Sequence, residues 1–212
     1  MTPSDSEQIL KILSSFYGEV KADLNFSNTY ELTVAVVLSA QTTDRQVNSV
    51  TGKLFLKYPD FGSLAKARLT DVEKIIKSTG FYHAKAKNIV KLAGIVTSVF
   101  NGKLPGDMEN LLTLPGVGRK SANVILSIGF GIPGLAVDTH VGRIARRLGY
   151  TESENPDIVE KNLCSIIPRE LWRDTHLIFI RHGRTICKAR NPECRECPVS
   201  RHCAYFEELN VF

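Results

Sequence analysis

The stretch Leu114-Pro115-Gly116-Val117-Gly118-Arg119-Lys120 leads directly into the apolar-patterned run from Ser121 to Ile128. The residues before it, Asp107 to Leu112, carry acidic groups at their start and predict a short helix, so residues 107–128 should form a helix, a glycine hairpin and a second helix. Gly116 and Gly118 can both adopt a positive φ, and with Val117 they would present backbone N–H groups beside a helix N-terminus. Such a group of amides suits a phosphate, although a plain corner between two helices is the structural alternative.

Lys120 lies in the first turn of the second predicted helix, where the helix dipole disfavours a cation and where Arg119 adds another positive charge. An amine in such surroundings is suited to act as a nucleophile.

Asp138 precedes the next predicted helix, within Val137-Asp138-Thr139-His140-Val141. The glycine-rich and proline-rich break from Gly129 to Gly134 could bring Asp138 and Lys120 toward one cleft. Asp138 can be a simple N-cap, but a carboxylate at this place can also stabilise positive charge that develops on a sugar ring. An amine and a carboxylate beside a phosphate site point to attack at C1′ of a nucleotide.

The composition is that of a globular protein with a basic surface. The 212 residues are 43% hydrophobic and 23% charged, with a net charge of +5 and a pI near 9.0, which favours a polyanionic partner. The longest nearly apolar run, Leu32 to Ala40, is far shorter than the roughly 20 residues that span a bilayer. The N-terminal residues lack the features of a secretory signal. We therefore expect a cytoplasmic monomer without membrane contact, associated with the nucleoid if the source is prokaryotic.

Hydrophobic periodicity predicts an all-α protein. Leu32 to Ala40 is apolar on every side and should be a central buried helix, because no second strand candidate could pair with it. A capping-box pattern at Thr70 and Glu73 predicts another helix start. Lys85, Lys87 and Lys91 then fall on what we expect to be the solvated face of a long helix. The other predicted helices run from Ser4 or Asp5 to Tyr17, from Val47 to Tyr58, from Ala84 to Phe100, from Asp138 to Leu148, from Asn155 to Ile167 and from Trp172 to Ile186.

Four of the five cysteines are concentrated near the C-terminus, at Cys187, Cys194, Cys197 and Cys203. In a reducing compartment this spacing indicates one metal site rather than disulfides. Four thiolates suit both tetrahedral zinc and a 4Fe-4S cluster, and the spacing alone favours zinc, because zinc is the commoner metal in structural four-cysteine sites. The basic residues around this loop, including Arg184, Lys188 and Arg190, are either a solvated surface or a platform for phosphates.

These motifs together resemble those of the endonuclease III family of DNA glycosylases and AP lyases. The resemblance rests on Leu38 to Asp44, on the hairpin from Leu114 to Lys120, on Val137 to Val141 and on the four-cysteine loop. It implies an all-α helix-hairpin-helix glycosylase fold, with two helical domains that flank a DNA-binding cleft. One domain would be residues 22–132, a helical barrel that contains the hairpin. The other would join residues 1–21 to residues 133–212 and hold the cluster loop at 187–203.

The resemblance also implies the identity of the cofactor and the roles of single residues. It replaces zinc by a 4Fe-4S cluster on the four cysteines, and it makes Lys120 the nucleophile and Asp138 the catalytic carboxylate. Gln41 would fill the gap left by a flipped nucleotide, and Phe81 occupies the position of a second wedge residue. The DNA-binding residues then expected are Gln41, Phe81, Gly116, Val117, Gly118, His140, Arg143, Arg184, Lys188 and Arg190.

The expected function is base excision repair of damaged double-stranded DNA. The enzyme would remove oxidised pyrimidines through a Schiff base on Lys120 and cleave the strand by β-elimination on the 3′ side. Related adenine-excising enzymes replace the lysine and carry an additional C-terminal domain, so Lys120 favours the bifunctional branch. The alternatives are a mismatch-directed glycosylase on the same scaffold and a non-catalytic iron-sulfur protein that only binds DNA.

Overall fold

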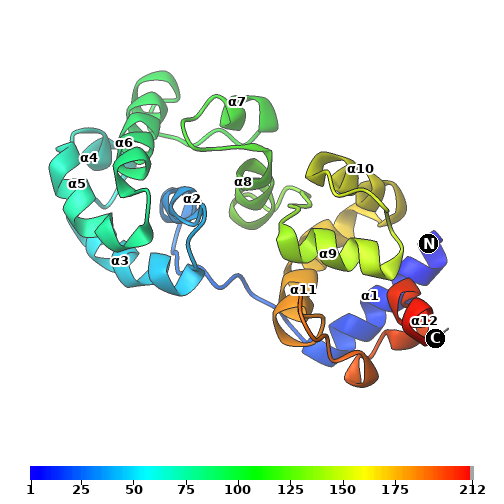
Figure 1. Ribbon diagram of the computed structural model, residues 1–212. Helices are drawn as coiled ribbons and strands as arrows, with labels where there is room; N and C mark the ends of the chain where they lie inside the picture. Colours follow the sequence, from blue (N-terminus) through cyan, green and yellow to red (C-terminus); the bar gives the residue numbers. More distant parts are fainter. Residues whose placement is uncertain (211–212) are drawn as a thin grey trace. The chain divides into compact units, whose positions relative to one another are not determined.

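The computed structural model describes residues 1–210 of the chain. Its regular structure is helical and no strand occurs in these residues, which confirms the predicted all-α class (Figure 1). No helix in this part of the chain has both the length and the apolar character that crossing a membrane requires. The contacts divide the chain into two compact units, which we call the hairpin unit (Ala22–Ile132) and the cysteine unit (Met1–Lys21 with Pro133–Phe212).

Helix α2 (Thr29–Leu38) forms the centre of the hairpin unit. Every residue from Leu32 to Leu38 is buried, because helices pack against all sides of α2. The Asn28 side chain caps α2 by accepting a hydrogen bond from the Glu31 amide at 2.9 Å. The other helical elements of the unit are α3 (Asp44–Lys57), α4 (Phe61–Ala65), α5 (Leu69–Ile76), the 3₁₀ turn η1 (Lys77–Thr79), α6 (Tyr82–Val99), α7 (Met108–Leu112), α8 (Arg119–Val124) and the π-helical turn η2 (Ile125–Gly129).

The capping box predicted at Thr70 and Glu73 is wrong. The N-cap of α5 is Arg68, two residues before Thr70, and it makes no side-chain capping bond. Glu73 instead pairs with Nδ1 of His83 at 2.9 Å, at the start of α6. A capping box does occur at α4, a helix that the periodicity missed, where Asp60 and Ser63 satisfy each other's amides.

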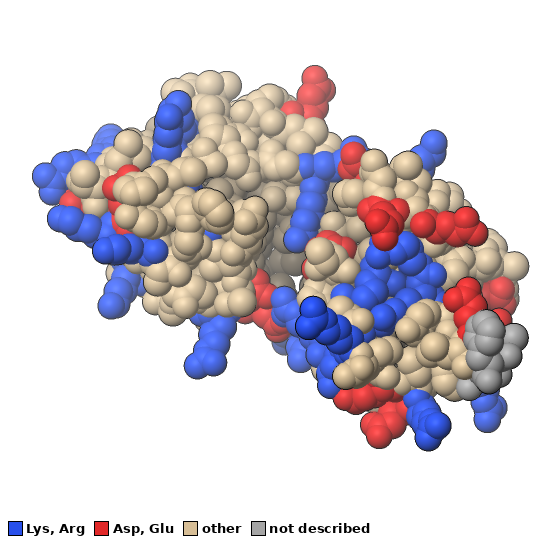
Figure 2. All heavy atoms as spheres, in the orientation of Figure 1, with Lys and Arg blue, Asp and Glu red and all other residues tan. Residues whose placement is uncertain are grey.

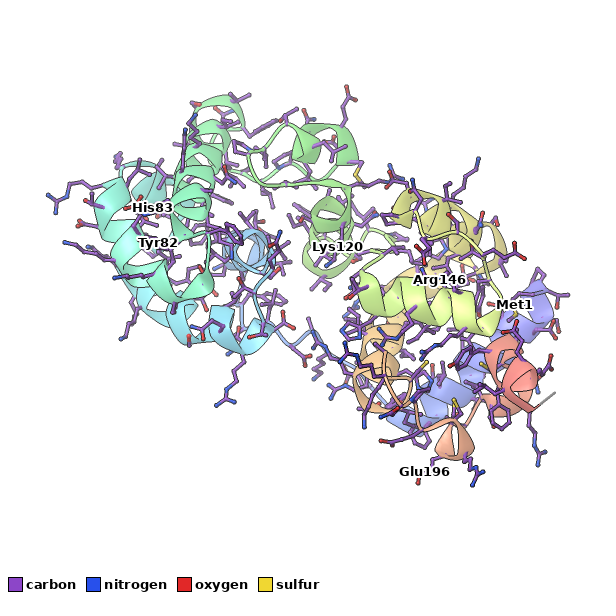
Figure 3. All side chains as sticks on the ribbon, viewed as in Figure 1. Met1, Tyr82, His83, Lys120, Arg146 and Glu196 are labelled. Atoms are coloured by element: carbon purple, nitrogen blue, oxygen red, sulfur yellow. The ribbon has the colours of Figure 1, made fainter. Side chains whose placement is uncertain are left out.

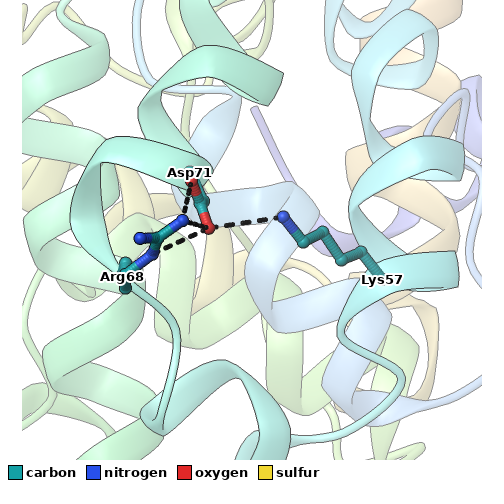
Figure 4. A network of polar contacts seen from close by, with 3 residues as sticks. All are labelled: Lys57, Arg68 and Asp71. Atoms are coloured by element: carbon teal, nitrogen blue, oxygen red, sulfur yellow. Dashed lines mark hydrogen bonds and ion pairs between the residues drawn. The ribbon is translucent and has the colours of Figure 1, made fainter.

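A polar network links α3 to α5 in the hairpin unit (Figure 4). Asp71 accepts hydrogen bonds from the Arg68 guanidinium at 3.0 Å and from Nζ of Lys57 at 3.5 Å. The bond from Arg68 lowers the pKa of the Asp71 carboxyl group. The pairing lies at the surface, so its contribution to stability is small.

The cysteine unit is built from both ends of the chain. Ile9, Leu10 and Leu13 of α1 pack into the same core as Ile144 and Phe179. Helix α1 is capped by Thr2 and not by Ser4 or Asp5, the two caps that the sequence predicted; Asp5 is instead the third residue of a capping box. The helical elements of this unit are α1 (Pro3–Tyr17), α9 (Thr139–Leu148), α10 (Pro156–Ile166), the 3₁₀ turn η3 (Arg169–Leu171), α11 (Trp172–Thr185), the 3₁₀ turns η4 (Cys194–Glu196) and η5 (Ser200–His202), and α12 (Ala204–Asn210).

Candidate functional site

The turn between α7 and α8 is a tight hairpin that requires one of its two glycines. Gly116 has a φ of +82°, and a Cβ atom there would lie 2.9 Å from Cγ1 of Val37 on α2. The hairpin is thereby packed directly against the central helix. Gly118 differs from the prediction: it adopts an extended backbone with φ −96° as the N-cap of α8, and a Cβ there would meet nothing within 4 Å.

The hairpin leaves backbone amides available for a ligand. The Val117 amide donates to the carbonyl of Leu114 at 3.1 Å, and the Val117 side chain is buried. Within residues 1–210 the amides of Gly116 and Gly118 make no such bond. Together with the first turn of α8, they form an arrangement that suits an anion.

Lys120 is the second residue of α8, and its side chain is exposed to solvent (Figure 3). The helix continues from α8 into the wider turn η2, with Ile125 and Leu126 buried in the core. The backbone that carries Lys120 is therefore anchored by buried side chains one turn further on. An exposed amine on a fixed backbone is free to meet a reactive carbon on a ligand.

Asp138 is the N-cap of α9 in the cysteine unit. Its Oδ1 atom accepts hydrogen bonds from the amides of His140 and Val141, both at 2.8 Å. The structure thus confirms the capping role that the sequence offered as the simpler alternative. Nδ1 of the buried His176 lies 2.8 Å from the carbonyl oxygen of Ala136, which helps to fix the segment that leads to Asp138.

Gln41 and Phe81, both in the hairpin unit, have left-handed backbones. Their φ values are +53° and +43°, which few residues other than glycine adopt. Both side chains are exposed, and Phe81 has an exposed fraction of 70%. Residues with strained backbones are frequent at functional sites, so the positive φ values agree with a functional role for Gln41 and Phe81.

The four cysteines of the C-terminal loop line one cavity, whose empty volume is about 370 Å³ and includes open solvent. Burial raises the pKa of the Cys197 thiol to about 11 and also raises the pKa values of Cys194 and Cys203. The fifth cysteine, Cys164, lies elsewhere on α10. Among residues 1–210, no three His, Cys, Asp or Glu side chains are arranged as a site for one metal ion.

Three residues that we had not assigned to the cysteine loop hold it in place. Arg147 donates to Sγ of Cys187 at 3.3 Å and to the carbonyl of Lys188 at 2.8 Å. Nε2 of the buried His182 lies 3.6 Å from Sγ of Cys197, and Nδ1 of the same ring lies 2.8 Å from the Tyr17 hydroxyl. The spacing of Arg143 and Arg147, one turn apart on α9, was the signal that could have revealed a shared face.

Arg143, predicted to bind DNA, is used inside the protein. Its guanidinium donates to the carbonyl oxygens of Gly183 and Cys187, both at 2.9 Å. Its neighbour His140 is half-buried, and burial lowers the pKa of the imidazole. Arg143 therefore ties α9 to the end of α11 and to the first cysteine, and a contact with DNA stays a prediction.

The other basic residues predicted to bind DNA are Arg184, Lys188 and Arg190. All three are exposed, but some of them interact with other groups of the protein. Nζ of Lys188 pairs with Oε1 of Glu193 at 2.5 Å, so this charge is partly neutralised within the loop. Arg184 also interacts within the protein. On the face drawn in Figure 2, Lys and Arg side chains gather on the cysteine unit with acidic side chains beside them.

Comparison with known proteins identifies the family. The model of the HhH-GPD superfamily of base excision DNA repair proteins matches residues 34–169, more than half of the chain. Endonuclease III of Synechocystis sp. is 44% identical over 197 residues, which cover 92% of this chain and 90% of that protein. The chain belongs to the endonuclease III family. It is accordingly a base excision repair enzyme with DNA glycosylase and AP lyase activity.

Two solved structures of endonuclease III bound to DNA match this chain over nearly its whole length. A non-covalent endonuclease III–DNA complex matches with a TM-score of 0.93 and 40% identity, covering 100% of both chains. A trapped endonuclease III–DNA covalent intermediate, an estranged-adenine complex, matches with a TM-score of 0.92 and 41% identity, covering 99% of both chains. These matches confirm the predicted helix-hairpin-helix glycosylase fold.

Proposed function

We propose that this enzyme excises oxidised pyrimidines from double-stranded DNA and then cleaves the strand at the abasic site. The observation that carries the proposal is Lys120, an exposed amine one turn beyond a hairpin with available amides. A protein that only held phosphates would need those amides and would not need an amine beside them. Similarity over the full length to a covalently trapped endonuclease III–DNA complex supports the same chemistry.

The proposed reaction begins with a flipped nucleotide. Gln41 and Phe81 fill the space it leaves, while the amides of Gly116 and Gly118 donate hydrogen bonds to a backbone phosphate. The Lys120 amine attacks C1′ and displaces the base, which leaves with a proton. The C1′–O4′ bond then breaks, O4′ takes a proton, and C1′ becomes doubly bonded to the Lys120 nitrogen as a Schiff base. The Schiff base acidifies C2′, so loss of a C2′ proton expels the 3′ phosphate.

Asp138 is proposed to stabilise the positive charge that develops on the sugar as the base leaves. Its Oδ1 atom accepts hydrogen bonds from two backbone amides, which hold the carboxylate in one orientation. Capping and catalysis are therefore compatible roles for one side chain.

A panel of duplex oligonucleotides, each with one damaged base, tests the proposal. We expect base release and strand cleavage at oxidised pyrimidines, and little at alkylated purines or at undamaged mismatches. The measurement is product formation on a denaturing gel, with and without alkaline treatment. Activity confined to a mismatch would instead assign the mismatch-directed alternative.

We further propose that Cys187, Cys194, Cys197 and Cys203 hold a 4Fe-4S cluster, within the domain formed by residues 1–21 and 133–212. The four thiols share one cavity, and Arg147 directs an N–H group at one of the sulfur atoms, as suits a thiolate. A four-iron cluster gives each thiolate its own iron, so the ligands need not converge on a single point as they do for zinc. With four protein ligands the cluster has no open position, and its role would be structural.

The purified protein should be brown and contain about four irons per chain. Replacing Cys197 by serine should lower the iron content and destabilise the cysteine unit, whereas replacing Cys164 should leave the iron content unchanged. Metal analysis and the visible absorption spectrum measure this directly. A colourless protein with one zinc per chain would restore the zinc alternative.

DNA binding is proposed to involve the exposed Arg184 and Arg190, with Lys188 contributing less because of Glu193. His140 and Arg143 are proposed to act near Asp138, the former from a half-buried position. The positive net charge is consistent with this partner.

A further inference from the structure

Lys85 is a buried lysine that the proposed reaction does not use. We expected it on the solvated face of α6, but the exposed fraction of Lys85 is only 5%, while Lys87 two residues later is exposed. Burial lowers the pKa of the Lys85 amine, and no carboxylate pairs with it within residues 1–210. Burying a charged side chain without a carboxylate partner lowers the stability of the fold. A lysine at this position therefore indicates a role that an apolar side chain could not fill.

The Lys85 amine joins two turns of the hairpin unit. Nζ donates to Oγ1 of Thr42 at 2.6 Å and to the carbonyl oxygen of Thr79 at 2.7 Å. The Thr42 hydroxyl itself donates to the same carbonyl of Thr79, which closes a triangle of three polar groups. Because the carbonyl only accepts and the hydroxyl proton is already used, the third corner must be a donor, and an ammonium group is a donor only.

The two joined turns carry two of the three non-glycine residues of this unit that have a positive φ; the third, Asn101, lies elsewhere in the sequence. Thr42 directly follows Gln41, and Thr79 lies two residues before Phe81. A second link, from Nε2 of Gln46 on α3 to Oγ of Ser78 on η1 at 2.6 Å, lies at the surface nearby in sequence. The turns that contain Gln41 and Phe81 are thus joined through Thr42, Thr79 and one buried amine.

We propose that Lys85 is a positioning residue that fixes the turns of Gln41 and Phe81 as one rigid wedge, which enters the base stack while a nucleotide is flipped. The inference rests on the proposed roles of Gln41 and Phe81 in DNA binding. Lys85 does not touch the reacting atoms. Its contribution is to prevent the two turns from relaxing separately when they are pressed against stacked bases, where small displacements reduce rates strongly.

The test compares Lys85→Met with the wild type and with Lys87→Met as the matched control on the exposed side of the same helix. Methionine keeps the length and apolar character of the lysine stem and removes the donor. The probe is a duplex with a non-cleavable abasic-site analogue opposite 2-aminopurine, whose fluorescence rises when it is unstacked. Each protein is added to saturation, verified by fluorescence anisotropy.

For Lys85→Met we expect the fluorescence rise at saturation to fall about threefold or more, and borohydride trapping on duplex with an abasic site to slow about tenfold. Lys87→Met should match the wild type in both. If Lys85→Met lowers only the melting temperature and gives the full fluorescence rise at saturation, the side chain is merely structural and the inference is overturned.

Thr42→Val provides a second route if Lys85→Met does not fold. It removes the hydroxyl corner of the triangle with little change in shape, and we expect the same loss of fluorescence rise. A full rise with this variant would also overturn the inference. A wild-type protein that fails to form a covalent adduct with an abasic site refutes the proposed function instead, whereas one that forms the adduct without unstacking 2-aminopurine refutes only the wedge.

Discussion

Lys120→Ala should lose the covalent adduct with damaged DNA while keeping its affinity for duplex DNA. The nucleophilic amine is gone, and removing such a group reduces the rate at least about a thousandfold. The phosphate contacts are made by backbone amides of the hairpin, which the substitution leaves in place. Borohydride trapping measures the adduct and a gel shift measures the affinity.

Lys120→Ala should fold normally, so a loss of the adduct would not result from unfolding. The side chain is exposed in the first turn of α8, so its removal leaves no cavity. Loss of a cation from a helix N-terminus is expected to stabilise the helix by about 0.3–1 kcal/mol. Lys87→Ala, another exposed lysine, is the control for a change in net charge. Trapping of Lys120→Ala at the wild-type rate would show that another amine is the nucleophile.

Asp138→Asn should fold and bind DNA but release damaged bases about a hundredfold more slowly. The amide oxygen of asparagine can still accept the hydrogen bonds from His140 and Val141, so α9 stays capped. The negative charge that would stabilise an oxocarbenium-like transition state is absent. Single-turnover base release on an oxidised pyrimidine measures the effect, and thermal melting checks the fold.

The comparison with Asn155→Ala separates capping from catalysis. Asn155 caps α10 in the same unit through its Oδ1 atom, and its loss should cost about 1 kcal/mol of stability without altering base release. Full excision by Asp138→Asn would leave Asp138 as a capping residue only.

Periodicity and chemical type made much of the hairpin unit predictable. The run from Leu32 to Leu38 is apolar on all sides, and only a helix surrounded by other helices satisfies it. Gly116 was identified because glycine can adopt a positive φ in a tight turn, and the structure adds that a Cβ atom there would meet Val37. Asp138 was identified as a cap because a carboxylate before a helix has a strong local reason to be there.

Features that depend on contacts between residues distant in sequence could not be predicted from local sequence patterns. The capping pattern at Thr70 is local, but Glu73 has a better partner in His83. In the sequence, Lys85 and Lys87 are both lysines near the start of one helix, and nothing local distinguishes them. Lys85 is buried because the turns at Thr42 and Thr79 lie against it. Likewise, the spacing of Arg143 and Arg147 indicates that they share one face of α9, but it does not indicate that this face contacts the cysteine loop rather than solvent. Tertiary contacts decided each of these cases.

The assembly of one unit from both ends of the chain has a consequence for its biosynthesis. Helix α1 leaves the ribosome first, but α11, against which it packs, is finished only at Thr185, roughly 170 residues later. At about 5–20 residues per second, α1 waits roughly 10–30 s for that partner. The hairpin unit is completed in the meantime, since its residues are contiguous. During this interval Ile9, Leu10 and Leu13 have no core to enter, so the nascent chain has a period in which its first helix is open to chaperones or to aggregation.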